Sequence, residues 1–386
     1  MKIFFDHQIF SLQTYGGISR YFFELMSHLR KISDVSIRNS ILYSRNVYLD
    51  QSFPHEEYLN YENWLIPKYF KGKNRLLKLF QILSLAPNHD LEMEKFVFQE
   101  FGKGNCDIFH PTYYNPYFLD FAKKYKIPYV ITVHDLIHER YPYFFENSAE
   151  TIREKTETVL NAKRVIAISQ STKNDLISYY NIPENKIDVV YHGRSFKLQG
   201  ASTDIKKEER YILFVGNRSH YKNFIFFVES ILPLLREFHD LKIFAAGGGV
   251  FSLEELKLFK KFKIEDQVVH KTFLSDIALA HLYQNATLFV FPSLYEGFGI
   301  PLLEAMDAGC PVVCSNTSSF PEIAEKSAYY FDPTNSESIE KAVREVLTKR
   351  ELQVHLRELG FQNISRFSWD KTAIETYKVY EKGIRY

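Results

Sequence analysis

Strand-like and helix-like runs alternate along almost the whole 386-residue chain, in two successive series. The apolar runs of the first series are 1–6, 106–111, 129–135, 164–169 and 187–193. Those of the second series are 211–217, 241–249, 268–273, 287–293 and 311–316. Parallel strands need helix-sized crossovers, whereas antiparallel strands can be joined by short turns. The alternation therefore predicts an α/β protein with parallel sheets.

The polar, aperiodic stretch 194–210 separates the two series. Such a stretch is typical of a linker. We therefore expect two Rossmann-like domains that face each other, each with its own parallel sheet.

Composition excludes several classes of protein. No apolar run approaches eighteen residues, so no transmembrane helix is expected, and Asp6 and His7 interrupt the segment where a signal peptide needs an apolar core. Three cysteines, Cys106, Cys310 and Cys314, form neither a disulfide framework nor a zinc-finger spacing. The net charge of +1 does not favour nucleic acid as a partner. A cytoplasmic protein is expected.

The stretch YEGFGIPLLEAMDAGCPVV, residues 295–313, has glycines and prolines where a glycine loop followed by a helix would need them. An apolar run precedes it, and Gly297 and Gly299 indicate a turn. Pro301 is tolerated in the first turn of a helix, and Gly309 is a common stop after the last. This arrangement leaves an open helix N-terminus at the ligand-binding edge of a parallel sheet.

The sequence lacks the short motifs that mark a metal-bound diphosphate site, a dinucleotide-binding loop or a P-loop. No two aspartates are separated by one residue, and neither G-x-G-x-x-G nor a P-loop occurs. Without a metal, a departing diphosphate must be stabilised by side-chain cations and helix dipoles. Arg218 and Lys222 follow the first strand of the second series, where phosphate oxygens can be bound. The alternative interpretation is a solvated turn with two surface cations.

The stretch 295–313 resembles the E-x7-E signature of the retaining glycosyltransferases of family 4, with Glu296 and Glu304 as its two glutamates. Five further stretches are similar to this family, densely over 211–386 and more sparsely over 1–197: 5–25, 215–223, 273–293, 318–333 and 367–381. The resemblance implies the GT-B fold. It predicts an acceptor-side domain over 1–197, a nucleotide-sugar donor domain over 208–367, and a C-terminal helix, 368–386, that returns to the first domain.

The resemblance also implies roles for individual residues. Glu304 would bind the donor ribose, and Glu296 and His134 would lie beside the transferred sugar as the catalytic pair. The diphosphate would be bound by Arg218, Lys222, Gly16, Gly17, Phe298, Gly299 and Ile300. The donor base or sugar would lie near Gly247, Phe273, Leu274 and Gly297. Several of these residues have a simpler alternative: an exposed helical carboxylate near the helix N-terminus for Glu304, a structural histidine for His134, and plain turns for Gly16, Gly17 and Gly247. One departure from the family weakens the assignment of Arg218 to the diphosphate, because the family often has its arginine one position earlier, where this chain has Asn217.

The activity implied is retaining transfer of a hexose, without metal or cofactor, to a sugar or lipid-linked acceptor in polysaccharide or glycolipid biosynthesis. A UDP-glucose-like donor is favoured, with GDP-mannose as the second choice. The basic, aromatic stretch 63–86 could rest on the inner face of an anionic membrane, or be an ordinary solvated helix and loop. The alternatives are a noncatalytic sugar-nucleotide-binding subunit, or another GT-B enzyme such as a sugar-nucleotide epimerase.

Overall fold

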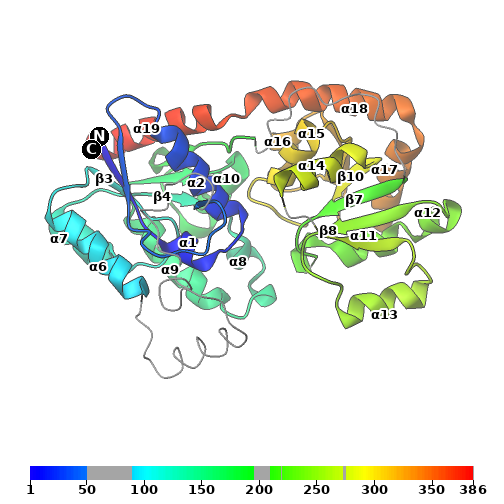
Figure 1. Ribbon diagram of the computed structural model, residues 1–386, viewed down its shortest axis with the longest axis horizontal. Helices are drawn as coiled ribbons and strands as arrows, with labels where there is room; N and C mark the ends of the chain where they lie inside the picture. Colours follow the sequence, from blue (N-terminus) through cyan, green and yellow to red (C-terminus); the bar gives the residue numbers. More distant parts are fainter. Residues whose placement is uncertain (50–88, 195–208, 219, 273–274, 386) are drawn as a thin grey trace, which may run out of the picture.

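The computed structural model describes residues 1–49, 89–194, 209–218, 220–272 and 275–385 (Figure 1). Two α/β domains lie side by side. The predicted domain boundaries, 197 and 208, and the stretch 63–86 lie outside the described residues.

The first domain is built on a parallel sheet. Its strands are β1 (Lys2–Phe5), β2 (Ser36–Asn39), β3 (Ile108–His110), β4 (Val130–Val133), β5 (Arg164–Ala167) and β6 (Ile187–Val189). Their order is β2-β1-β3 and β4-β5-β6, and a parallel bridge between Phe109 and Tyr129 joins the two halves. Its helices are α1 (Gln8–Leu12), α2 (Gly17–Leu29), α6 (His89–Gly102), α7 (Leu119–Tyr125), α8 (Ile137–Arg140), η1 (Pro142–Phe144), α9 (Ser148–Asn161), α10 (Gln170–Tyr180) and η2 (Glu184–Lys186).

The second domain has a six-stranded parallel sheet of order β12-β11-β10-β7-β8-β9. The strands are β7 (Tyr211–Val215), β8 (Lys242–Ala246), β9 (Val268–Lys271), β10 (Leu288–Phe291), β11 (Val312–Ser315) and β12 (Ala328–Phe331). The helices are η3 (His220–Lys222), α11 (Phe224–Ser230), α12 (Leu232–Glu237), α13 (Leu253–Phe262), α14 (Asp276–Asn285), α15 (Ile300–Asp307), α16 (Phe320–Ala324), α17 (Ser336–Thr348), α18 (Arg350–Asn363) and η4 (Ile364–Arg366).

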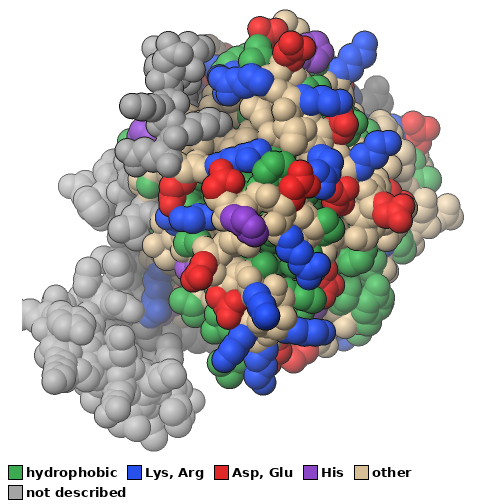
Figure 2. Space-filling model, turned by 90° about the vertical axis from the view of Figure 1, so that its right-hand side faces the viewer, with side chains coloured by type: hydrophobic (Ala, Val, Ile, Leu, Met, Phe, Trp, Pro, Cys, Tyr) green, Lys and Arg blue, Asp and Glu red, His purple; other side chains and the backbone are tan. Residues whose placement is uncertain are grey.

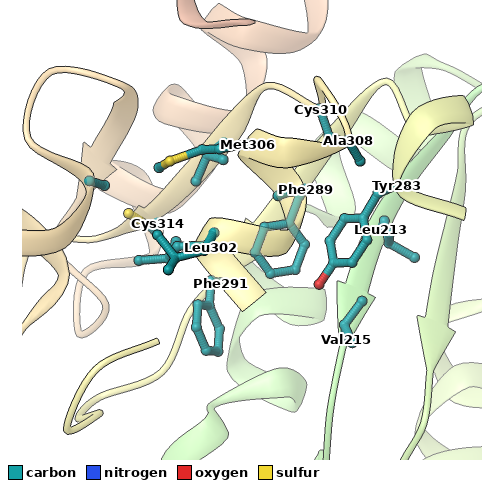
Figure 3. Close-up of a cluster of buried hydrophobic side chains, with 14 of the residues drawn as sticks. Leu213, Val215, Tyr283, Phe289, Phe291, Leu302, Met306, Ala308, Cys310 and Cys314 are labelled. Carbon is teal, nitrogen blue, oxygen red and sulfur yellow. The ribbon is translucent and has the colours of Figure 1, made fainter. Parts of the chain in front are cut away.

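The central strands of this sheet are covered on both faces, which explains their unbroken apolar sequence. Along β10, Phe289 and Phe291 pack into the core under α14 and α15, whereas Leu288 and Val290 pack into the core under α11 and α17. Figure 3 shows the first of these cores, with Phe289 and Phe291 beside Leu302 of α15.

The last helix, α19 (Trp369–Arg385), leaves the second domain and packs on the first (Figure 1). Trp369, Ala373 and Val379 lie in the core between α2 and the first sheet, and the Tyr380 hydroxyl forms a 2.7 Å hydrogen bond with His110 Nδ1. The predicted GT-B architecture, including the returning helix, is confirmed.

Acidic and basic side chains are interspersed on the outer end of the second domain (Figure 2). The visible described surface there has no large area of one sign, as the near-zero net charge suggests.

Candidate functional site

The glycine loop between β10 and α15 touches the first domain directly. A Cβ built on Gly297 would lie 1.7 Å from the carbonyl oxygen of His134. The Gly297 carbonyl accepts hydrogen bonds from Ser169 Oγ at 2.6 Å and Thr172 Oγ1 at 3.3 Å, both at the start of α10. Only a residue without a side chain allows this approach.

Two helices from opposite domains begin beside each other at this contact. Gly299, in the left-handed region with φ 96°, precedes α15, and Pro301 occupies its first turn. A Cβ on Gly17, the first residue of α2, would lie 3.7 Å from Ile300 Cδ1. Helix N-termini present unpaired N–H groups and a positive dipole end. The predicted diphosphate-binding residues Gly17, Gly299 and Ile300 are thus brought together.

Gly16 lies just before α2, close to the side chain of Gln13. A Cβ on Gly16 would lie 2.2 Å from Gln13 Oε1, which accepts a 3.1 Å hydrogen bond from the backbone N–H of Ser19. Gln13, which the sequence did not single out, therefore caps the start of α2 through its side chain.

Lys222 and Glu296, predicted for the diphosphate and the sugar, form an ion pair. Lys222 Nζ donates to Glu296 Oε1 at 2.5 Å, and the two side chains are 17% and 15% exposed. Burial disfavours the charge on Lys222, but the Glu296 carboxylate more than offsets it, so the pKa of Lys222 is raised. Ser318 Oγ accepts from the Glu296 N–H and Ser319 Oγ donates to its carbonyl, which fixes the loop.

Arg218 has other partners. Its guanidinium forms a two-point ion pair with Glu255, at 2.7 and 3.3 Å, and donates to the carbonyls of Gly247 at 2.8 Å and Val250 at 3.0 Å. None of these groups is shared with Lys222. Arg218 therefore ties the loop after β7 to the loop after β8 and to the start of α13, and its phosphate role stays a prediction. Gly247, at φ 87°, makes the turn that presents its carbonyl.

Glu304 lies on α15, facing the other domain. It is 6% exposed. Its Oε2 accepts from the Tyr283 hydroxyl at 3.2 Å, and its Oε1 lies 3.9 Å from the Arg20 guanidinium. Burial raises the pKa of Glu304 to about 7, against the opposing effects of Arg20 and of the Tyr283 hydrogen bond. The predicted binding of the donor ribose by Glu304 stays a prediction.

Sequence reasoning missed Arg20. Its NH2 group donates to Asp276 Oδ2, on α14, at 2.7 Å. The residue stands in the stretch that carries the glycine pair, but a lone arginine on an amphipathic helix is usually solvated. Its partners are 256 and more residues away, so no local signal identifies them.

His134 follows β4 and is buried in an aromatic cluster. Its ring packs edge-on against Tyr21 with centroids 5.0 Å apart, and Phe22 and His192 lie within 6.0 Å. Its Nε2 has no hydrogen-bond partner among the described residues. Burial, followed by electrostatic interactions with His192, His110 and Lys155, holds the pKa of His134 well below its usual value. The imidazole is therefore neutral, its unpaired Nε2 is itself buried, and its role beside the donor sugar stays a prediction.

The remaining predicted residues have different outcomes. The Phe298 ring points into the domain interface, where it packs on His192 and Phe367 with centroids 4.6 and 5.9 Å apart, so only its backbone remains for a diphosphate. Phe273 and Leu274 lie outside the described residues.

The described part of the chain shows neither a metal cluster nor a membrane-spanning helix. No group of three or more His, Cys, Asp or Glu side chains there could hold a metal ion. Every helix there is too short or too polar to span a bilayer.

Comparisons with known proteins match both domains. The model of Glycosyltransferase Family 4 matches residues 15–195, and that of Glycosyl transferases group 1 matches residues 195–362. An uncharacterized glycosyltransferase of Methanocaldococcus jannaschii is 27% identical over 330 residues, covering 79% of this chain and 84% of the relative. O-antigen chain mannosyltransferase B of Escherichia coli is 26% identical over 294 residues, covering 71% and 74%.

Solved structures show the same fold. Sucrose-phosphate synthase from Thermosynechococcus elongatus superimposes with a TM-score of 0.74 at 18% identity, over 98% of both chains. HepE from Anabaena, in complex with UDP-glucose, superimposes with a TM-score of 0.69 at 16% identity, over 99% of this chain and 98% of the other. With both halves matched in order by the two models, the chain belongs to family 4 of the glycosyltransferases and has their GT-B fold.

Proposed function

We propose that this glycosyltransferase is a retaining, metal-independent hexosyltransferase that uses a nucleotide-diphosphate sugar as donor. The observation that carries the proposal is the meeting of Glu296, Lys222 and the start of α15 with His134 and the start of α2, across the contact at Gly297. A noncatalytic sugar-nucleotide binder would need the cation and the helix starts, but neither a buried neutral histidine nor a second carboxylate beside the loop.

In the proposed reaction, the bond between the anomeric carbon and the diphosphate breaks as the acceptor oxygen attacks the same face of the sugar. The leaving phosphate oxygen takes the acceptor's proton. Lys222 and the starts of α2 and α15 stabilise the negative charge that develops on the diphosphate, and one such preorganised donor is typically worth roughly 3 kcal/mol. In this proposal Glu296 stabilises positive charge on the sugar, and His134 holds a sugar hydroxyl as a neutral hydrogen-bonding group.

The donor sugar is proposed from the named relatives. The sequence alone favours a UDP-glucose-like donor, but the O-antigen chain mannosyltransferases B and RfbU and the serotype-specific mannosyltransferase WbdA are 26–29% identical to this chain. We therefore place a mannosyl donor, GDP-mannose, beside UDP-glucose as the first to be tested. The O-antigen chain named for two of these relatives favours a growing polysaccharide as acceptor, and a lipid-linked sugar is proposed from the sequence alone. Peripheral binding to the inner face of a membrane through 63–86 is proposed on sequence grounds alone.

Donor turnover is expected to persist in EDTA. The protein is incubated with a panel of nucleotide sugars and with mannosyl and glucosyl acceptors, and released nucleoside diphosphate is measured with and without chelator. Equal rates are expected, because Lys222 and two helix N-termini supply the positive charge. The anomeric configuration of the product is read by NMR. A rate that vanishes in EDTA and returns only with a divalent ion contradicts metal independence, and an inverted product contradicts retention.

Lys222→Ala is expected to weaken binding of the nucleoside diphosphate roughly tenfold to hundredfold, because a charge-assisted contact is worth about 1.5–3 kcal/mol. Calorimetric titration with UDP and GDP measures the loss. Lys242→Ala is the matched control, since Lys242 also pairs with a glutamate, Glu209, but stands at the start of β8, away from the glycine loop. Unchanged affinity in Lys222→Ala would move the phosphate role to Arg218.

A further inference from the structure

Arg20 belongs to the first domain, but its charged partners belong to the second. It stands on α2, is 7% exposed, and binds Asp276 of α14 through two contacts, at 2.7 and 3.4 Å. The same guanidinium lies 3.9 Å from Glu304 Oε1 on α15. One arginine therefore links two elements of the donor-binding domain to the start of the acceptor-side domain.

The distances distinguish its two partners. At 2.7 Å, Asp276 takes a direct hydrogen bond from the guanidinium, whereas at 3.9 Å Glu304 receives its charge but no direct hydrogen bond. Asp276 thus holds the Arg20 guanidinium 3.9 Å from Glu304 Oε1, so that this oxygen can still accept a hydrogen bond from another group. Glu304 Oε2 is already engaged by Tyr283.

Four ionisable groups, on α2, on α14 and in the segment just before α2, act on Glu304. Arg20, from α2, favours the ionised carboxylate by its charge, and Tyr283, from α14, favours it by a hydrogen bond. Asp276, also from α14, opposes ionisation, and Tyr15, just before α2, interacts with Glu304 electrostatically. A buried carboxylate tends to protonate unless an opposite charge accompanies it. Arg20 is the group that supplies this charge.

We propose that Arg20 is a positioning residue for recognition of the donor ribose: held by Asp276, it places its positive charge beside Glu304 and leaves one carboxylate oxygen able to accept ribose hydroxyls. Because Arg20 comes from the other domain, full ribose recognition requires the domains to be in contact. The inference rests on the proposed function, in which Glu304 binds the ribose. It adds a coupling between nucleotide recognition and the domain interface.

The test compares nucleotides with and without ribose hydroxyls. UDP and GDP, and their 2′,3′-dideoxy forms, are titrated by calorimetry into the wild type, Arg20→Gln, Arg20→Lys and Glu304→Gln. Arg344→Gln is the control, an exposed arginine paired with Glu237 and Glu340. The wild type and the control are expected to prefer the ribonucleotide about tenfold or more, as hydrogen bonds to a charged group allow.

Arg20→Gln and Glu304→Gln are expected to lose most of this preference near neutral pH, with little change in affinity for the dideoxy form. Arg20→Lys, which keeps the charge, is expected to retain most of it. The preference in the wild type should rise from about pH 6 to about pH 8 as Glu304 ionises, and Arg20→Gln should recover it only at higher pH. A merely structural role would not move this profile.

Contrary results separate the proposals. If Arg20→Gln loses equal affinity for the ribo and the dideoxy nucleotides, Arg20 acts on the phosphates or on the general alignment of the domains. If the preference for the ribonucleotide is unchanged, Arg20 has no role in ribose recognition. If Arg20→Gln does not fold, Asp276→Asn serves instead: the freed guanidinium should bond to Glu304, cover Oε1 and lower the preference, and an unchanged preference overturns the inference. If the wild type binds neither nucleotide, the proposed function itself fails.

Discussion

Replacement of Glu296 by glutamine is expected to lower kcat by about 100-fold or more while nucleoside diphosphate affinity stays near the wild-type value. In the proposed function the carboxylate acts on the transferred sugar, where positive charge develops only as the bond breaks. Loss of a few kcal/mol of stabilisation present only in the transition state lowers kcat and kcat/KM together. Glutamine keeps the size of the side chain and can still accept a hydrogen bond from Lys222, so the cation stays in place.

Steady-state kinetics with calorimetric UDP and GDP titrations measure both quantities. Glu345→Gln is the matched control, because Glu345 also pairs with a lysine, Lys349, but lies on α17 away from the loop. Normal turnover by Glu296→Gln would remove the carboxylate from the chemistry. A large loss of nucleotide affinity would mean instead that Glu296 acts through the placement of Lys222.

Local sequence was sufficient for the elements that frame the site. Gly299 and Pro301 fix the start of α15 by their backbone preferences, and the apolar run before them is the buried strand β10. Parallel pairing followed from the length of the crossovers. These features depend on neighbours in the chain, so a single sequence contains them.

The ion pairs of the site could not be predicted in the same way. Lys222 and Glu296 are 74 residues apart, and Arg20 and Asp276 are 256 apart and belong to different domains. The place of Arg218 after β7 also gave no sign that its guanidinium pairs with Glu255, which belongs to a capping box at the start of α13. Such pairings are decided by how loops and domains pack, which a local pattern does not specify.

Gly297→Ala tests the contact between the domains, and we expect it to lower kcat/KM by about 100-fold or more, the effect that a misplacement of about 1 Å can have. The backbone of Gly297 is not in the left-handed region, so alanine is compatible with the loop itself. The obstacle is the other domain: the new Cβ would lie 1.7 Å from the His134 carbonyl oxygen and 2.9 Å from its carbon. Both are backbone atoms, so the loop or the whole domain must move.

The variant should therefore keep two folded domains and lose their close approach. Thermal unfolding is expected to change little, whereas small-angle scattering should show a larger radius of gyration and kinetics the loss of kcat/KM. Gly102→Ala is the matched control, because the three atoms nearest its Cβ would all belong to the Tyr125 side chain, at 3.4 Å or more. Wild-type kinetics in Gly297→Ala would show that the chemistry does not need this contact. A fall in the unfolding temperature as large as that of a core substitution would show that Gly297 serves the loop rather than the interface, because a clash with the other domain alone leaves each core intact.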